Sequence, residues 1–112
     1  MTDEQLVNAL KALGHPVRLR IMQALTRNEL NVGEIDEAAD IGQPTLSQQL
    51  AVLRNTGLVR TRKEAKLVYY RIEESALQEV SASVGQLGGA PAAPVRNSRP
   101  FAPGVANFAK LA

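Results

Sequence analysis

The sequence contains no cysteine, and this absence excludes several kinds of functional site. Its 112 residues include no Cys, no Trp and one His. Without thiols the chain can form no disulfide, no thiolate metal site and no cysteine nucleophile. The single histidine, His15, precedes Pro16 at the expected start of a helix, where a capping or packing role is more common than metal binding. We therefore expect no metal and no other cofactor.

The sequence also lacks long apolar runs and the usual signatures of an enzyme. No run approaches the roughly 20 apolar residues that span a bilayer. The N-terminus "MTDEQLVNAL" is acidic where a signal peptide would be basic. We find no nucleophile beside a base, no phosphate-binding glycine loop and no cluster of metal ligands. These absences predict a cytoplasmic protein that is neither a membrane protein nor an enzyme.

Charge is small in total but uneven along the chain. The net charge is +2, yet residues 29–40 contain five acidic side chains and no Lys or Arg. Residues 42–72 contain six basic side chains against Glu64 alone. A basic surface of this kind favours a polyanionic partner, although a solvated charged face would give the same pattern.

Helical periodicity, caps and breakers predict five helices and one hairpin. The helices are expected within residues 2–14, 15–28 and 73–89, and at 32–40 and 44–56, where Asn31 can cap the third helix and Gly57 ends the fourth. A β-rich run beginning at residue 58 and a second run at residues 67–72 predict a hairpin with its tip near residues 63–66. Two helices joined by a tight turn and followed by a basic hairpin indicate a winged helix-turn-helix, a mainly α fold with a β-hairpin wing (α+β). Residues 1–87 would form this domain, and the Pro-, Ala- and Gly-rich residues 88–112 a flexible tail.

The segment 44–56 has the pattern of a helix that recognises DNA. Leu46, Leu50 and Leu53 form an apolar stripe, so that Gln48 lies nearly opposite at about 100° per residue. Glutamine can pair with adenine in the major groove, and Ser or Thr can reach a base edge or a phosphate. A solvated polar face is the alternative interpretation. The candidate base-reading residues are Gln43, Thr45, Ser47 and Gln48.

The basic residues of the hairpin are candidates for contacts with the DNA backbone. A projecting hairpin can place Lys and Arg along phosphates or in a minor groove. Charged side chains at a sheet edge also block strand-to-strand aggregation, and both roles can hold together. The candidate backbone contacts are Arg54, Arg60, Arg62, Lys63 and Lys66.

The first and last helices carry apolar stripes that predict a homodimer. In the last helix the apolar residues recur at spacings of three and four, a narrow seam that favours a partner helix. Two recognition helices related by a two-fold axis would bind a pseudo-palindromic operator in double-stranded DNA. The candidate interface residues are Leu6, Leu10, Leu77, Val80, Val84 and Leu87.

These motifs together resemble the ArsR family of bacterial transcriptional repressors. The resemblance rests on "LKALGHPVRLRIMQAL", "VGEI", "QPTLSQQLAVLRNTGLV" and "RKEAKLVYYRI", and it covers roughly residues 5 to 75. It implies a dimeric winged helix whose first and last helices form the interface. It also implies that the protein binds operator DNA and is released by an inducer.

The sequence is similar to the thiol- and sulfide-responsive branch of that family but lacks its cysteines. One such cysteine commonly stands at about the position of Gln23, and the cysteine or His and carboxylate ligands of metal-sensing members are also missing. The inducer is therefore unknown. Repression without an inducer, an apolar ligand, a partner protein, the tail itself and replaced natural cysteines are the alternatives. The alternative function is a winged helix that only binds proteins, because a fold does not determine a function.

Overall fold

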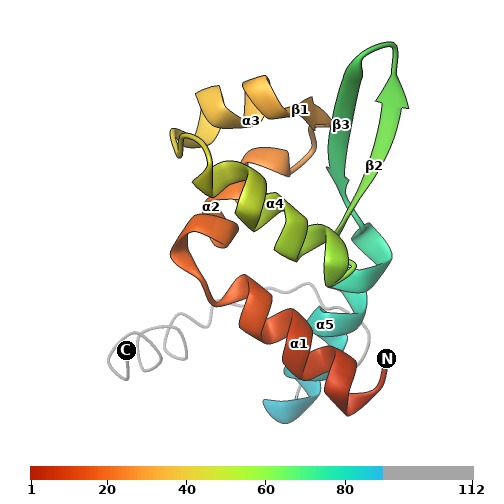
Figure 1. The fold of residues 1–112 in the computed structure, drawn as a ribbon. Helices are drawn as coiled ribbons and strands as arrows, with labels where there is room; N and C mark the ends of the chain where they lie inside the picture. The colour runs from red at the N-terminus through yellow and green to blue at the C-terminus, as the bar shows by residue number, and fades with distance from the viewer. Residues whose placement is uncertain (90–112) are drawn as a thin grey trace, which may run out of the picture. The chain divides into compact units, whose positions relative to one another are not determined.

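A computed structural model describes residues 1–89 as five helices and a three-stranded sheet (Figure 1). The predicted tail lies outside the described residues from position 90 onward. In chain order the elements are α1 (Asp3–Leu13), α2 (Pro16–Leu25), β1 (Leu30–Asn31), α3 (Val32–Ala39), α4 (Thr45–Asn55), β2 (Val59–Glu64), β3 (Leu67–Ile72) and α5 (Glu74–Leu87). The predicted α+β class and its element order are confirmed, with β1 in addition.

Local capping explains where the first three helices begin. The Thr2 side chain accepts a hydrogen bond from the Gln5 backbone N–H, and Asn31 caps Glu34 in the same way. In both pairs the longer side chain bonds back to the cap, which satisfies two otherwise unpaired backbone donors. His15 caps α2, because its Nδ1 accepts from the Val17 N–H at 3.2 Å. The predicted capping role of His15 is confirmed.

The core lies between the helices and the base of the hairpin. Its largest fully buried side chains are Ile21, Leu25, Ile35, Leu46, Leu50, Leu53 and Leu58. Met22 of α2 is also buried, whereas Ala24 on the same helix is only partly buried. Helix α4 supplies three of these leucines, so one of its faces is anchored against the rest of the domain.

Helix α1 packs its alanines against the core and leaves part of its leucine stripe exposed. Ala9 and Ala12 are its buried residues, while Leu6 and Leu13 pack at the edge of the core. Leu10 is 40% exposed. Small side chains allow α1 to approach the core closely, and this leaves Leu10 on the outer face.

The three strands form an antiparallel sheet in the order β1-β3-β2. Strand β1 pairs Leu30 with Tyr70 and Asn31 with Tyr69. Its two residues are too few to show an alternating pattern, so the sequence did not predict it. Tyr70 packs against the core, as expected for one of two neighbouring tyrosines on a strand.

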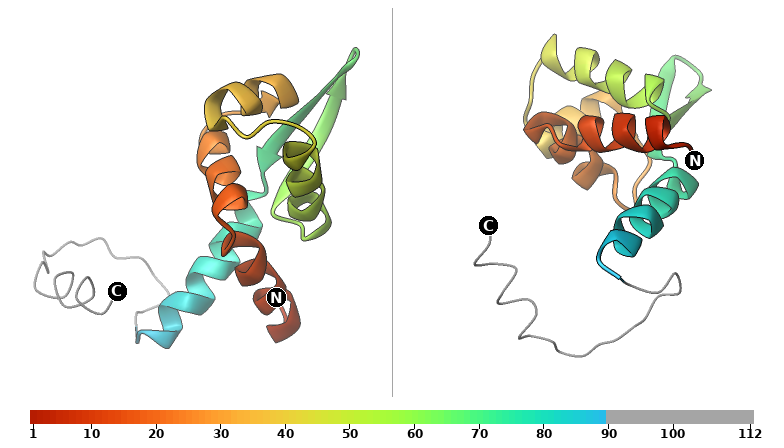
Figure 2. Two further views of the ribbon diagram at one scale, coloured as in Figure 1. Left: turned by 60° about the vertical axis from the view of Figure 1, so that its left-hand side comes forward. Right: turned by 90° about the horizontal axis from the view of Figure 1, so that it is seen from below.

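Strands β2 and β3 form the predicted hairpin, which extends beyond the helices (Figure 2). Glu64 pairs with Leu67, so the turn consists of Ala65 and Lys66. Ala65 has a φ of 56°, in the left-handed region that favours glycine. The predicted tip near residues 63–66 is confirmed.

Residues Met1–Ser81 form one compact unit, and helix α5 continues beyond it to Leu87. Val80 is 5% exposed and belongs to the core of this unit. None of the helices in residues 1–89 has the length and hydropathy needed to cross a bilayer.

Candidate nucleic-acid interface

The turn between α3 and α4 orients the two helices of the helix-turn-helix. Asp40 ends α3 in the left-handed conformation, and Gly42 has a φ of 86° that glycine adopts without steric cost. The Gly42 N–H donates to the Asp36 carboxylate at 2.8 Å. This hydrogen bond ties the turn back to α3 and sets where α4 begins.

Helix α4 begins one residue later and ends one residue earlier than predicted, at Thr45 and Asn55. Pro44 occupies the N-cap and has no side-chain acceptor for the first backbone donors. Gln43 supplies one instead, since its Oε1 accepts from the Ser47 N–H at 3.1 Å and from the Ser47 hydroxyl at 2.7 Å. Gly57 follows the helix with a φ of 83°, which confirms its predicted role as the stop.

The structure brings the four candidate base-reading side chains together at the start of α4. Gln43, Thr45, Ser47 and Gln48 are all exposed, while Leu46 and Leu50 of the same turns are 0% and 1% exposed. Within residues 1–89 the side chains of Thr45 and Gln48 form no hydrogen bond, so their polar groups are available to a ligand. Gln43 and Ser47 are engaged with each other and retain donors and acceptors at their outer sides.

Arg62 of the hairpin is held by two carboxylates of the protein itself. Its guanidinium contacts Glu29, which lies just before β1, at 2.8 Å, and it also contacts Glu64 on its own strand. The guanidinium carbon lies 4.8 Å from the centre of the Tyr69 ring, within range of a cation–π interaction. The sequence predicted Arg62 as a backbone contact, but the structure shows that its charge already has partners.

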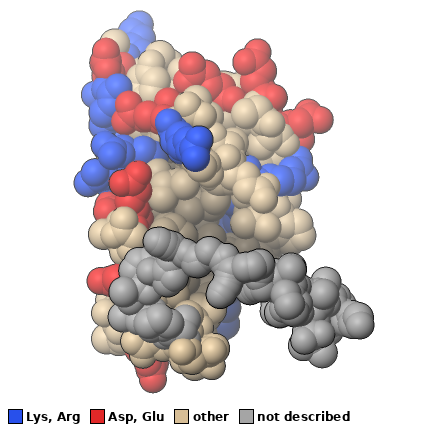
Figure 3. All heavy atoms as spheres, turned by 180° about the vertical axis from the view of Figure 1, so that it is seen from behind, with Lys and Arg blue, Asp and Glu red and all other residues tan. Residues whose placement is uncertain are grey.

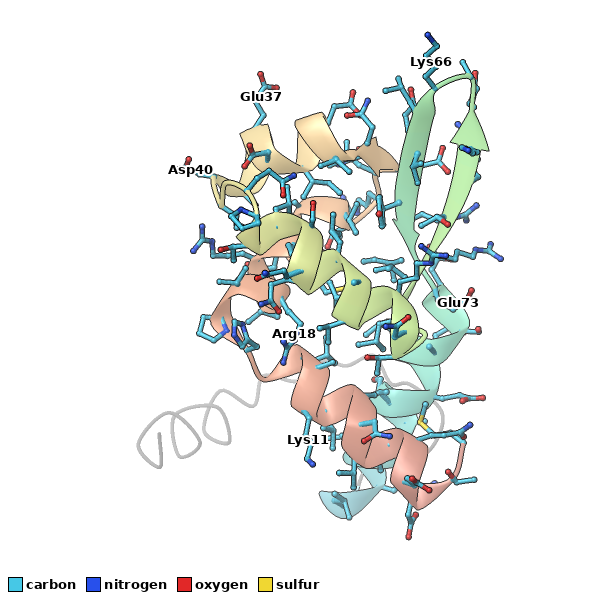
Figure 4. The ribbon with its side chains drawn as sticks, in the orientation of Figure 1. Lys11, Arg18, Glu37, Asp40, Lys66 and Glu73 are labelled. Carbon is cyan, nitrogen blue, oxygen red and sulfur yellow. The ribbon has the colours of Figure 1, made fainter. Side chains whose placement is uncertain are left out.

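The remaining cations of the interface differ in their pairing. Arg60 lies 3.5 Å from Glu73. Among the described residues, Arg54, Lys63 and Lys66 form no ion pair, and Lys66 stands at the tip of the hairpin (Figure 4). Seen from behind, Lys and Arg gather along the edge of the molecule where the hairpin lies, with Asp and Glu among them (Figure 3). Arg54 and the two lysines are therefore the predicted backbone contacts whose charges are least compensated.

The pairing with Arg62 also alters the titration of Glu29. The hydrogen bond from the Arg62 side chain holds the pKa of the Glu29 carboxyl below its usual value, against a smaller opposing effect of desolvation. The same pairing raises the pKa of Arg62. Both groups are consequently charged at neutral pH, and Glu29 competes with any external anion for Arg62.

Helix α3 presents an acidic surface beside the candidate interface. Glu34, Glu37 and Asp40 are exposed, and Glu37 and Asp40 point away from the other helices (Figure 4). The predicted segregation of acidic and basic segments is thus present in three dimensions. A polyanion would be repelled by this surface, which restricts where it can approach.

The candidate dimer residues differ in how much of each side chain is exposed in the single chain. On α1, Leu10 is 40% exposed and Leu6 is partly buried. On α5, Val84 and Leu87 are 42% and 83% exposed, and Leu77 is partly buried. Val80 needs correction as an interface residue, because at 5% exposure it packs in the core of its own chain.

Sequence reasoning missed two arginines of α2 that join helices together. Arg18 donates to Ala12 O, Lys11 O and Gln49 Oε1, and Arg20 donates to Ala39 O and Asp40 O. Their partners lie 6 to 31 residues away in the sequence, which no local pattern reveals. An arginine two residues after a helix-opening proline was the only signal present.

This arrangement defines the class of winged helix-turn-helix proteins: a helix pair with a fixed turn, an exposed polar face on the second helix, and a charged hairpin. Residues 15–61 match the family described as bacterial regulatory protein, arsR family. The chain belongs to the ArsR family.

Known proteins of several bacteria are similar to this chain. It is 49% identical to the biofilm growth-associated repressor of Xylella fastidiosa over 71 residues, and this aligned segment covers 63% of this chain and 62% of that protein. It is 47% identical to the transcriptional activator HlyU of Vibrio cholerae over 66 residues, and this aligned segment covers 59% of this chain and 61% of that protein. The matched part thus spans about three fifths of these curated relatives.

Solved structures match over a larger share of their length. The transcriptional repressor BigR from Xylella fastidiosa is 43% identical with a TM-score of 0.61, and the match covers 78% of this chain and 96% of that one. HlyU from Vibrio cholerae is 38% identical with a TM-score of 0.63, and the match covers 78% and 97%. These similarities confirm the resemblance drawn from the sequence motifs.

Proposed function

We propose that this protein is a sequence-specific DNA-binding transcriptional repressor that acts in the cytoplasm as a homodimer on a pseudo-palindromic operator. The observation that carries this proposal is helix α4. Its leucines are buried at 0 to 1% exposure, and this anchoring leaves Gln48 exposed on the opposite face with Thr45 and Ser47 exposed on either side. A rigid helix with uncharged polar groups at its start suits the reading of bases in a major groove.

Within this proposal α4 reads bases and the hairpin holds the backbone. Among residues 1–89 the Gln48 amide has no hydrogen-bond partner, and such an amide can bond adenine at two positions. Lys63, Lys66 and Arg54 have charges free of ion pairs among residues 1–89 and would contact phosphates. Arg60 and Arg62 would contact them only after loosening their carboxylate partners. Phosphate contacts add affinity and orientation with little sequence choice.

The proposed dimer forms through α1 and α5, each of which carries exposed apolar side chains. The supporting residues are Leu10 on α1 and Val84 and Leu87 on α5. Two α4 helices related by a two-fold axis would then address half-sites about 34 Å apart. Leu10→Asp and Val84→Asp should each split the dimer and abolish operator binding, whereas a charge at Val80 would disrupt the core instead.

The proposed repressor differs from thiol-based sensors in the signals it can receive. With no cysteine in its 112 residues, it should keep its operator in the presence of thiol oxidants, sulfide or arsenite, because those signals act on sulfur. Zinc should also fail to release it at levels that release metal-sensing proteins. Release by zinc or a persulfide at low micromolar concentration would contradict this part of the proposal.

The proposal is tested by selecting binding sites from a randomised DNA pool. The expected product is a set of duplexes with a common two-fold-related motif, bound with an affinity that falls steeply with salt because counterions are released. Sedimentation should show a dimer at micromolar concentration. A module that binds only proteins would instead show weak DNA affinity and no enriched motif. A reporter gene placed behind the selected motif then decides the direction of control, since HlyU is named an activator.

A further inference from the structure

Arg18 joins three helices through its guanidinium group. It lies on α2, donates from Nε to Ala12 O at 2.8 Å and from Nη2 to Lys11 O at 3.3 Å, and donates from Nη1 to the Gln49 side chain on α4 at 2.7 Å. Figure 4 shows Arg18 between the end of α1 and α4. One side chain therefore contacts both α1 and the helix that we propose to read DNA.

The α1 partners of Arg18 are carbonyls that the helix itself leaves unpaired. Leu10 O receives the Gly14 N–H, but the last carbonyls of a helix have no intrahelical donor and carry the negative end of its dipole. A guanidinium presents several donors in a rigid plane and a permanent positive charge, so it suits this position better than a lysine. The charge and the geometry both hold Arg18 at the end of α1.

The α4 partner of Arg18 is held in a single orientation. Arginine has no acceptor, so the Gln49 amide must turn its oxygen toward Arg18. Gln49 is partly buried and lies one position after the exposed Gln48. The bond to Gln49 thus restrains α4, in addition to its buried leucines, at the turn that carries the candidate base-reading groups.

A cleft beside Arg18 separates α1 from the end of α4, so the hydrogen bonds of Arg18 matter more for the spacing of these two helices. The cleft has a volume of about 340 Å³ and is lined from α1 by Asn8, Lys11 and Ala12 and from the end of α4 by Val52, Asn55 and Thr56. Side chains do not fill the space between the helices at this point. The hydrogen bonds of Arg18 cross from one helix end to the other beside it.

We propose that Arg18 is a positioning residue for DNA recognition, which sets the orientation of α4 relative to α1 without itself contacting DNA. This inference rests on the proposed function, in which α1 belongs to the dimer interface and α4 reads bases. In a dimer, the orientation of α4 relative to α1 determines whether both recognition helices fit adjacent grooves at once. Arg18 therefore contributes to the preference for an operator over other DNA, and not to the general attraction for phosphates.

The test compares Arg18→Lys and Gln49→Ala with matched controls. Arg18→Lys keeps the charge and removes the planar set of donors. Its control is Arg27→Lys, since Arg27 follows α2, is exposed and makes no side-chain hydrogen bond among residues 1–89. Gln23→Ala, an exposed glutamine on α2, controls for Gln49→Ala. Each variant is titrated with the duplex selected by the wild-type protein and with a scrambled duplex of the same composition.

Arg18→Lys and Gln49→Ala should each weaken binding to the selected duplex by roughly tenfold, the order expected for two directly coupled groups, and leave scrambled-duplex affinity unchanged. The double variant should lose no more than Arg18→Lys alone, because that substitution already removes the bond to Gln49. The controls should keep the wild-type ratio of the two affinities. Urea unfolding and sedimentation of every variant identify any loss that comes from unfolding or dissociation.

Two results would overturn the inference in distinguishable ways. In the first result, the wild-type protein prefers the selected duplex, and both Arg18→Lys and Gln49→Ala fold, form dimers and keep that preference. Arg18 then has no positioning role. If Arg18→Lys does not fold, Gln49→Ala alone decides the same question. A wild-type protein with no preferred duplex would overturn the proposed function and this inference with it.

Discussion

The outer face of α4 and the hairpin β2–β3 are both exposed, but they are held in place by different forces. Helix α4 is anchored by three leucines that are fully buried, and the exposed side chains at its start carry no charge. The hairpin is held by strand pairing, and its exposed side chains are charged and partly paired with acids. Rigid uncharged groups suit the reading of bases, whereas charges that can exchange partners suit the holding of a backbone.

This difference teaches that the basic character of a segment does not measure its free positive charge. The hairpin contains Arg62, but Glu29 and Glu64 compensate that side chain. The carboxylate of Glu29 comes from a different part of the chain. Electrostatic attraction for DNA should therefore depend more on Lys63 and Lys66 than on Arg60 and Arg62, which are paired with acids.

The strongest way to break the comparison is to remove the anchor of α4. Leu50 is 1% exposed, so Leu50→Ala should lower the free energy of unfolding by about 2 to 5 kcal/mol through lost burial and a residual cavity. Leu67→Ala on the hairpin, where the side chain is 48% exposed, is the control and should cost less than about 0.5 kcal/mol. Urea denaturation measures both values. Equal losses at the two sites would show that burial does not distinguish the two regions.

A second change addresses the reading face without disturbing its anchor. Gln48→Ala should weaken binding to the selected operator by about 1 to 3 kcal/mol and relax the choice at one base pair, because a bidentate bond to a base is lost. Competition binding against single-base operator variants measures the change. A uniform loss across all sequences would assign Gln48 to the backbone instead.

A third change tests the free charges of the hairpin. Lys66→Ala should weaken binding to every DNA sequence alike and lower the slope of log affinity against log salt by about 1. Arg62→Ala should lower that slope less, since two carboxylates already compensate its charge. Titrations at several salt concentrations decide between them. A larger effect of Arg62 on the slope would mean that DNA displaces its acidic partners completely.

The smallest expected effect concerns the pH dependence of the Glu29 and Arg62 pair. Because the pKa of Glu29 is lowered in the folded state, the pair stabilises the fold above the unfolded-state value of 4.5, and this contribution is lost as the pH falls through the lowered pKa. Wild-type protein and Glu29→Gln should therefore differ in unfolding free energy at neutral pH, and the difference should shrink as the pH falls below 4.5.

The same Glu29→Gln variant should bind all DNA sequences slightly more tightly at neutral pH, because Arg62 loses one competitor. Unchanged DNA affinity together with a normal fold would show that Arg62 remains held by Glu64. A stability difference that grows on acidification would contradict the assigned direction of the pKa.

Local features of the sequence were sufficient to predict most of the elements. Helix caps such as Asn31, the stop at Gly57 and the leucine stripe of α4 involve residues within four positions of one another. At that distance the backbone geometry of a helix nearly determines which side chains share a face. The exposed face of α4 followed from its buried face, and so the candidate base-reading residues were found.

Only the tertiary structure decided which long side chains find partners. The bond of Arg18 to Gln49 spans 31 positions, that of Arg62 to Glu29 spans 33, and strand β1 exists only because β3 pairs with it. Flexible charged side chains reach several acceptors, and their choice depends on which elements the core brings together. The same holds for Val80, whose apolar spacing suited an interface until the fold placed it in the core. The sequence by itself thus determined the elements and the reading face, while packing decided which charges remain free to hold DNA.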